Sequence, residues 1–257
     1  MTPPTILALE RATLTTVPAP RTGFDGPFVV RAFAGGTGRA NAASSLDPSP
    51  DPDLPARIER IEARYGAMGL PVRFRSTPLD PPGLADLLVA RGYEPKDETA
   101  ILLAPIASIA AADPAAEAHP APDADWMAVT ATAEHQSLRR RQEKEGTPPL
   151  LTTPGAWITL REDGTTAAVA SVVVTGSVAG YFDLAVRPEF RRRGLAARAV
   201  RAAADWARHQ GAEWMFCQVA MTNTASLALN TTLGLREAYR YTYWVRPQDG
   251  VPTLKFG

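Results

Sequence analysis

Apolar residues in the second half of the chain follow two different periods, and the two alternate along the sequence. Within residues 195–209, Ala196, Val200 and Ala203 recur at helical spacing and share one face. Short apolar runs bounded by turn residues predict strands between such helices. The predicted helices are 125–145, 195–209 and 224–233, and the predicted strands are 156–160, 167–174, 181–186, 214–220 and 237–245. Alternation of helices with strands predicts an α/β domain built on a mixed sheet.

The first half of the chain repeats part of this order. The predicted helices there are 54–68 and 84–91, and the strands that follow them are 72–75 and 98–103. The glycines that close these helices, Gly69 and Gly92, precede Gly211 and Gly234 by the same distance, 142 residues (211 − 69 and 234 − 92). Equal spacing of two helix–glycine–strand units predicts a duplicated domain.

Residues 105–123 separate the two repeats. They are small, rich in proline and nearly free of large apolar side chains, which is typical of a linker. We therefore predict a first domain at 1–105, a linker at 106–122 and a second domain at 123–257.

Composition excludes several classes of function. Lys plus Arg and Asp plus Glu both number 27, so no global field attracts nucleic acid or an anionic membrane. Cys217 is the sole cysteine, which excludes an intramolecular disulfide and a CxxC metal site. No apolar run reaches the ~18 residues of a membrane span, and the first residues do not resemble a secretory signal. We expect a cytoplasmic protein without a metal, a nucleic-acid partner or a membrane partner.

The strongest candidate for chemistry is the turn from Arg191 to Ala196. A strand ends before Pro188, and the chain then enters a helix whose first turn carries Gly194 and Ala196. Unpaired N–H groups at a helix start bind anions, and small residues let a diphosphate approach the backbone closely. The same pattern alone also fits an ordinary helix start with solvated arginines. A P-loop and a dinucleotide-binding Rossmann turn are disfavoured, because neither GxxxxGK[ST] nor GxGxxG is present.

Two motifs in their order and spacing resemble the GNAT superfamily of N-acetyltransferases. The first is Arg191-x-x-Gly194-x-Ala196 after a strand that ends in Val-x-Pro. The second motif comprises Gln218-Val219, Asn223, Ser226, Leu229-Asn230 and Leu233-Gly234-Leu235. The resemblance covers roughly 125–246. It implies a tandem GNAT-like fold in which the first copy is degenerate.

The resemblance implies acetyl-CoA as co-substrate and a primary amine of a small molecule or peptide as acceptor, which attacks directly in a ternary complex. The strand with Leu184, Ala185 and Val186 would splay from 214–219 and pair with the pantetheine arm, and the Ala185 N–H would polarise the thioester carbonyl. Residues implied to bind the pyrophosphate are Arg191, Arg192, Arg193, Gly194, Leu195 and Ala196. Asn223 would reach the pantetheine chain. Asn230 is also placed among the cofactor-binding residues, at the position of the tyrosine that commonly protonates the leaving thiolate, and it cannot supply that proton.

Asp183 is the first candidate for the general base, because it is a carboxylate in an apolar strand. Strand alternation predicts that it shares a face with Tyr181 and Ala185. A sheet-face carboxylate fixed by a neighbouring arginine or a backbone donor is a nearly equal alternative. Tyr243, with Tyr241, is a candidate for the missing acid or for the acceptor pocket, although packing alone also explains a tyrosine in such a strand.

The remaining titratable residues of interest are predicted to be non-catalytic. His135 is expected at the surface, His119 in the linker and His209 at a helix end, where it interacts with the helix dipole. Cys217 is expected to be buried and inert.

The first domain has no equivalent of the diphosphate-binding turn. The corresponding residues 49–54 lie in a segment with three prolines, which lack N–H donors, and several aspartates, which repel phosphate. The glycine-rich run 35–41 predicts a hairpin turn, from which Arg39 and Asn41 would face a cleft between the domains.

Two other classes of function remain open at this stage. A non-catalytic acyl-CoA-binding or sensing module is motivated by Asn230. Nucleic-acid binding through the runs 139–141 and 191–193 is disfavoured, because the charge is balanced and no aromatic residues interleave with either run. A homodimer is compatible with the sequence.

Overall fold

The computed structural model describes residues 2–134 and 136–247, whose strands form one eleven-stranded mixed sheet. The helices are α1 (Ile6–Thr16), α2 (Leu54–Ala67), α3 (Leu84–Ala90), α4 (Ala124–Ala131), α5 (Leu138–Gly146), α6 (Leu195–His209) and α7 (Thr224–Thr232). The strands are β1 (Arg21–Asp25), β2 (Phe28–Ala32), β3 (Ala43–Ser45), β4 (Arg73–Ser76), β5 (Glu94–Pro105), β6 (Ala116–His119), β7 (Gly155–Glu162), β8 (Thr165–Thr175), β9 (Val178–Val186), β10 (Trp214–Ala220) and β11 (Arg236–Val245). The predicted mixed α/β class is confirmed.

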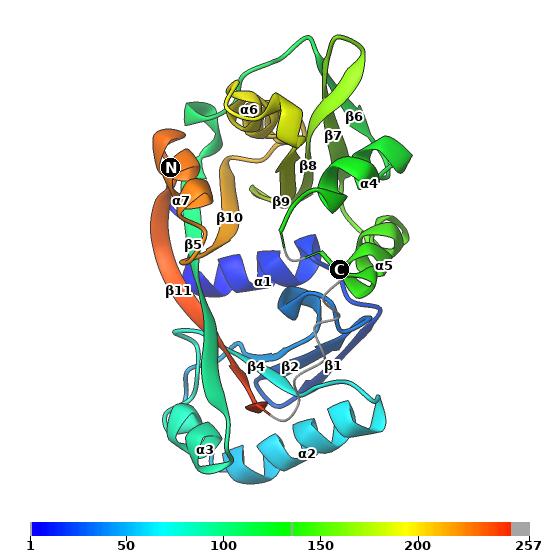
Figure 1. The fold of residues 1–257 in the computed structure, drawn as a ribbon. Coiled ribbons are helices and arrows are strands. Elements are labelled where there is room, and N and C mark those ends of the chain that lie inside the picture. Colours follow the sequence, from blue (N-terminus) through cyan, green and yellow to red (C-terminus); the bar gives the residue numbers. More distant parts are fainter. Residues whose placement is uncertain (1, 135, 248–257) are drawn as a thin grey trace.

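The two halves of the chain, residues 2–105 and 106–247, exchange their last strands. The sheet order is β1-β2-β3-β4-β11-β5-β10-β9-β8-β7-β6, so β5 lies between β10 and β11, and β11 lies between β4 and β5. In Figure 1 these two long strands run past both halves of the molecule. Each half therefore completes the sheet of the other with backbone hydrogen bonds.

The predicted spacing of 142 residues recurs in the exchanged strands. Thr99 of β5 stands opposite Tyr241 of β11 in the antiparallel ladder. The two residues are 142 positions apart (241 − 99), which is the spacing found between the helix-closing glycines. The pairing of β5 with β11 is therefore centred on positions that the predicted repeat makes equivalent.

Helices cover the sheet in two groups. Ile58, Ile61 and Tyr65 of α2 pack with Phe28 and Phe74 in a core of the N-terminal half. Alanines and Val200 of α6 pack on β8, β9 and β10 in the core of the C-terminal half. Helix α1 crosses the middle of the molecule between the halves (Figure 1), where Leu9 and Ala12 belong to a third core with residues of β9, β10 and β11.

Three local predictions differ from the structure. The segment 106–122, predicted as a linker, contains β6, which pairs with β7 at the sheet edge. An edge strand tolerates the small residues and flanking prolines that suggested a linker. The helix predicted at 125–145 is two helices, since α4 ends at Ala131 and the Ser137 side chain caps α5 by accepting from Arg140 N–H. Helix α1 was not predicted, although the Thr5 hydroxyl caps it at Ala8 N–H. The division at 105 and 123 stays a prediction.

No helix within residues 2–134 and 136–247 is long and apolar enough to cross a bilayer. His119 lies on β6, where its Nε2 is 3.0 Å from the Thr159 hydroxyl, and His209 is the last residue of α6. The prediction for His135 lies outside the described residues.

A buried ion pair joins α1 to the exchanged strands. The Glu10 carboxylate pairs with the Arg75 guanidinium of β4, and the two side chains are 1% and 4% exposed. Glu10 also accepts a hydrogen bond from the Tyr239 hydroxyl of β11, and the Arg75 guanidinium lies 3.8 Å from the centroid of the Tyr241 ring. The Glu10 and Arg75 charges therefore meet only when α1, β4 and β11 are assembled, and Nε and Nη2 of Arg75 stay buried without a hydrogen-bond partner in the described chain.

Replacement of Glu10 by alanine should therefore destabilise the fold by about 3–5 kcal/mol, because it leaves the Arg75 charge buried without a counter-ion. Urea unfolding of the two proteins measures the difference in free energy. The matched control is Glu98→Ala, which breaks a 3.1 Å pair with Arg240 that is about half exposed and should cost less than about 1 kcal/mol. Equal losses in the two variants would contradict the central role of the Glu10–Arg75 pair.

Candidate active site

The turn that precedes α6 presents free backbone donors. Gly194 is the N-cap residue with φ 77°, and Arg192 also has a left-handed φ of 62°. Within the described chain, the N–H groups of residues 192–196 have no hydrogen-bond acceptor, whereas Arg198 N–H already closes the first helical turn onto Gly194. A Cβ at Gly194 would meet no atom within 4 Å. The turn thus combines unpaired donors, the positive end of a helix dipole and open space in front of them.

The arginines of this turn have different surroundings. Arg191 is anchored, since its Nε donates to Val186 O at 3.3 Å and its Nη2 to Thr132 O at 3.4 Å. The Arg193 guanidinium lies 5.3 Å from the centroid of the Phe190 ring. All three arginines are exposed, and Leu195 is buried beneath them. The turn is therefore positively charged and anchored to the end of β9.

Strands β9 and β10 separate, as predicted. They pair in parallel only where Val178–Gly180 meets Trp214–Phe216. Beyond this point β9 continues on β8, and β10 continues on β5. Leu184, Ala185 and Val186 therefore lie on the open side of a V-shaped gap, which leads to the turn before α6.

Asp183 lies at a β-bulge in β9, and this changes its predicted orientation. Its φ is +54°, and the register with β8 shifts between Val169 and Ser171. Because of the bulge, Asp183 lines the same pocket as Phe182, whereas Tyr181 packs in the core on the opposite face. The prediction that Asp183 shares a face with Tyr181 is thus wrong. The prediction that Asp183 shares a face with Ala185 fits the structure. Ala185 packs with Trp157, and Trp157 lines the same pocket as Asp183.

The carboxylate of Asp183 is held by two neighbours. Lys144 Nζ of α5 lies 3.6 Å from Asp183 Oδ1, and the Ser171 hydroxyl donates to Oδ2 at 3.4 Å. Its side chain is 30% exposed, so it remains open to a ligand. The ion-pair partner is a lysine, whereas the alternative interpretation named an arginine or a backbone donor.

Asn230 is fully buried, which corrects its assignment to the cofactor site. Its Oδ1 accepts hydrogen bonds from the Tyr181 hydroxyl and from Cys217 Sγ, and its Nδ2 donates to Ser226 O at 2.9 Å. All of its polar atoms are thus used inside the core. Burial raises the pKa of the Cys217 thiol to about 12, which agrees with the predicted inert cysteine. Asn223, in contrast, is exposed and caps α7 by accepting from Ser226 N–H at 3.0 Å.

Tyr243 lies in a tyrosine pair deep between the halves. It is 9% exposed and packs edge-to-face on Tyr241, with ring centroids 5.3 Å apart. Burial raises the pKa of Tyr243, and the Tyr241 hydroxyl donates to Gln218 Oε1 at 2.9 Å. A Cβ at Gly38 would lie 2.4 Å from the Tyr243 ring, so this glycine allows the glycine-rich segment to cover it. The pair packs the junction and does not line the pocket described next.

One pocket lies between the halves on the face of the sheet opposite α6, and we name it the interhalf pocket. Its walls come from α1 and residues 37–39 of the N-terminal half, and from α5, β8 and β9 of the C-terminal half. The charged and aromatic residues that define its chemistry are Arg39, Arg140, Glu143, Lys144, Phe182 and Asp183. Arg39 thus faces a cleft between the halves, as expected.

Glu143 fixes the wall formed by α5. Its carboxylate accepts from Gly36 N–H at 2.8 Å, Thr37 N–H at 2.6 Å and Asn41 Nδ2 at 2.7 Å, with Ala34 N–H at 3.3 Å. The glycine-rich run is therefore a loop that binds an internal carboxylate, with the one-turn helix Gly38–Ala40 and the short strand β3 after it. Asn41 belongs to this contact and does not face the pocket.

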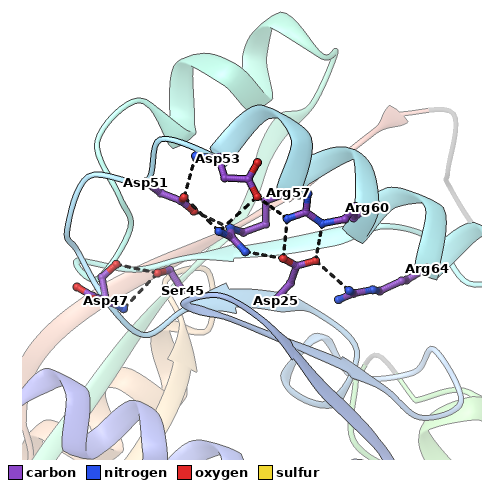
Figure 2. A network of polar contacts seen from close by, with 8 residues as sticks. All are labelled: Asp25, Ser45, Asp47, Asp51, Asp53, Arg57, Arg60 and Arg64. Atoms are coloured by element: carbon purple, nitrogen blue, oxygen red, sulfur yellow. Dashed lines mark hydrogen bonds and ion pairs between the residues drawn. The ribbon is translucent and has the colours of Figure 1, made fainter.

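The N-terminal counterpart of the turn before α6 is occupied by the protein's own charges. Figure 2 shows this network of Asp25, Ser45, Asp47, Asp51, Asp53, Arg57, Arg60 and Arg64 at the start of α2. Asp53 N–H donates to the Asp51 carboxylate at 3.1 Å, and Arg57 Nε binds the same carboxylate at 2.6 Å. The hydrogen bond from Arg57 lowers the pKa of Asp51, which keeps that carboxylate ionised. Pro55 has no N–H to offer, so this helix start has no open anion site.

Sequence reasoning missed three residues of α5 that line the pocket. Glu143 and Lys144 follow Arg140 by three and four residues, which places all three on one helical face. The run 139–141 was considered only as a surface for nucleic acid. The pattern of alternating charge on one face was the signal that could have identified Arg140 and Lys144. No group of three or more His, Cys, Asp or Glu suited to a metal occurs among the described residues.

The chain is similar to acetyltransferases over nearly its whole length. The family described as "Probable histone acetyltransferase Rv0428c C-terminal" matches residues 4–244. The "Uncharacterized N-acetyltransferase YobR" of Bacillus subtilis is 26% identical over 250 residues, which cover 94% of this chain and 98% of that protein.

Solved structures share the fold. A GCN5-related N-acetyltransferase from Kribbella flavida superposes with a TM-score of 0.71 at 18% identity, over 94% of this chain and 95% of that one. A tandem GNAT protein from the clavulanic acid biosynthesis pathway gives a TM-score of 0.58 at 14% identity, over 95% of this chain and 88% of that one. At these identities the likeness concerns the fold.

Replacement of Glu143 by alanine should loosen the interhalf pocket, because four N–H donors lose their acceptor. We expect a loss of about 2 kcal/mol of stability and faster amide exchange in residues 34–41. Hydrogen exchange measured by mass spectrometry tests this, with Glu145→Ala on the same helix as control, since Glu145 forms only an exposed pair with Arg141. Unchanged protection of residues 34–41 would contradict the anchoring role.

Proposed function

The chain belongs to the family of the Rv0428c C-terminal acetyltransferase and is a GNAT-type N-acetyltransferase; on this premise we propose that it transfers the acetyl group of acetyl-CoA to a primary amine. The observation that carries this proposal is the set of unpaired N–H donors at residues 192–196, at the open end of the gap between β9 and β10. The acceptor would attack within a ternary complex of enzyme, acetyl-CoA and amine.

The residues present fit the coenzyme. The donors before α6 and the arginines around them suit a diphosphate, since charge-assisted hydrogen bonds to backbone N–H groups are strong. The open side of β9 at Leu184–Val186 offers main-chain groups to an extended amide chain, in the manner of an added strand. Asn223 is exposed, and its Nδ2 group has no partner among the described residues. This donor suits the amide groups of the same extended ligand. When bound, acetyl-CoA supplies the activated acetyl group as a thioester.

The chain's own groups would position the amine and receive its proton. Asp183 is open to the interhalf pocket at the bulge of β9, and we assign it the role of general base for the acceptor ammonium. The N–H of Ala185, two residues along, is assigned to the carbonyl oxygen of the thioester. Lys144 would hold the carboxylate in place until the amine arrives.

A second candidate function is an acyl-CoA-binding module without turnover. It is favoured by one observation: Asn230 occupies the position of the family's tyrosine acid and is fully buried. The proposed enzyme would then release its thiolate without a proton from residue 230. Release of CoA thiol in the presence of amines separates the two functions, because a sensor binds the coenzyme without releasing the thiol.

Replacement of Gly194 by glutamate should abolish binding of acetyl-CoA, because it adds bulk and negative charge where we place the diphosphate. Calorimetric titration with acetyl-CoA measures this. Gly164→Glu is the matched control, since Gly164 has nearly the same φ (75°), is exposed and also has open space around it, but lies in the β7–β8 turn. It should bind normally. Unchanged affinity in Gly194→Glu would overturn the assignment of the turn.

Replacement of Asp183 by asparagine should lower kcat by about 100-fold or more, with unchanged affinity for acetyl-CoA, because the base is lost. Asparagine tolerates the left-handed backbone of this position. Steady-state kinetics measures the effect, and Asp163→Asn, an exposed residue with φ 50° in the β7–β8 turn, is the control. A kcat equal to that of the control would leave Asp183 with a structural role.

A further inference from the structure

The interhalf pocket contains more positive charge than its acids can neutralise. Arg39, Arg140 and Lys144 line it together with two carboxylates, Glu143 and Asp183. The Glu143 carboxylate is already bound by four N–H donors of residues 34–41. Asp183 is paired with Lys144. Within the described chain, neither Arg39 nor Arg140 forms an ion pair with a carboxylate, although the charge of Asp183 acts on both guanidiniums.

The surroundings of these two guanidiniums keep them in the pocket. Arg39 lies 5.5 Å from the centroid of the Phe182 ring, and it interacts with the Tyr241 hydroxyl. Arg31 Nη1 holds the carbonyl of Arg39 at 2.7 Å, which fixes the backbone there. Arg140 is half-buried on the face of α5 that carries Glu143 and Lys144. Burial lowers the pKa of Arg140, and the nearby positive charge of Arg39 lowers it further.

The pocket is separate from the site that we assign to the diphosphate of the coenzyme. The turn before α6 lies with the face of the sheet that α6 covers, where Leu184 packs near Leu195. Arg39 and Arg140 lie on the opposite face, with Phe182 and Asp183. Only the bulge at Asp183, where we place the reacting amine, is common to both regions.

We propose that the acceptor is a small amine that also carries an oxyanion group, a carboxylate or a phosphate, which binds between Arg39 and Arg140. This rests on the proposed function and names its substrate class. Guanidinium groups bind both oxyanions with paired hydrogen bonds. The amino group would lie at Asp183, and the oxyanion group deeper between α5 and residues 37–39. A basic peptide would bring further positive charge to these arginines and is disfavoured.

Matched pairs of amines test this with the full-length chain. L-Lysine and cadaverine differ by one carboxylate, and O-phosphoethanolamine and ethanolamine differ by one phosphate. With saturating acetyl-CoA, release of CoA thiol gives kcat/KM for each amine. We expect at least one oxyanion-bearing member to exceed its partner by about tenfold or more. The pair with the larger ratio identifies carboxylate or phosphate as the group.

Variants then locate the preference. Arg140→Gln and Arg39→Gln should reduce the ratio to near one, mainly through KM. Arg139→Gln, an exposed neighbour on α5 outside the pocket, should keep the wild-type ratio. Equal kcat/KM within both pairs, a preference for a lysine-rich peptide, or an unchanged ratio in Arg140→Gln would overturn the proposal.

A binding measurement separates failure of this inference from failure of the proposed function. Thermal unfolding without acetyl-CoA should show a higher Tm with an oxyanion-bearing amine than with its partner, and Arg140→Gln should lose this shift. If no amine releases CoA thiol but the shift is present, the substrate-class inference stands and acetyl transfer fails. If neither pair shows a difference in Tm or in turnover, the inference is wrong.

Discussion

The exchange of β5 and β11 between the two halves is the constraint on which the rest of the structure depends. Backbone hydrogen bonds of β5 are satisfied by β10 on one side and β11 on the other, so neither half has a complete sheet alone. Continuous pairing fixes the distance and angle between the halves. As a result α1 can bury Glu10 against Arg75, and residues 34–41 can bind Glu143 of α5. The interhalf pocket exists because both contacts close around it.

The helix starts of α6 and α2, which the predicted repeat makes equivalent, differ in backbone geometry and in what occupies them. In the C-terminal half, a glycine turn before α6 leaves backbone donors open to an anion. In the N-terminal half, Asp51 and Asp53 occupy the equivalent helix start and bind arginines of α2. At the start of α2, internal carboxylates thus occupy the place that an anion could take, and they stabilise the helix without a ligand. The N-terminal half contributes a wall of the interhalf pocket that carries Arg39.

Charge in the pocket is organised by a single irregularity in β9. The bulge at Asp183 places two consecutive side chains, Phe182 and Asp183, on the pocket face. Phe182 contacts Arg39, and Asp183 contacts Lys144, so one wall of the pocket engages both halves of the chain. The strand also parts from β10 just before this point. The places assigned to the amine and to the thioester therefore meet at one bend of the backbone.

The sequence by itself determined the mixed α/β class, the repeat spacing, the bounds of α6 and β10 and the turn from Arg191 to Gly194, because each follows from local periodicity or from glycine and proline chemistry. Tertiary structure decided the rest. Strand exchange, burial of Asn230 and docking of Glu143 all depend on contacts between residues distant in sequence, which no local pattern encodes. The face of Asp183 was mispredicted because a bulge breaks the alternation on which that prediction relied.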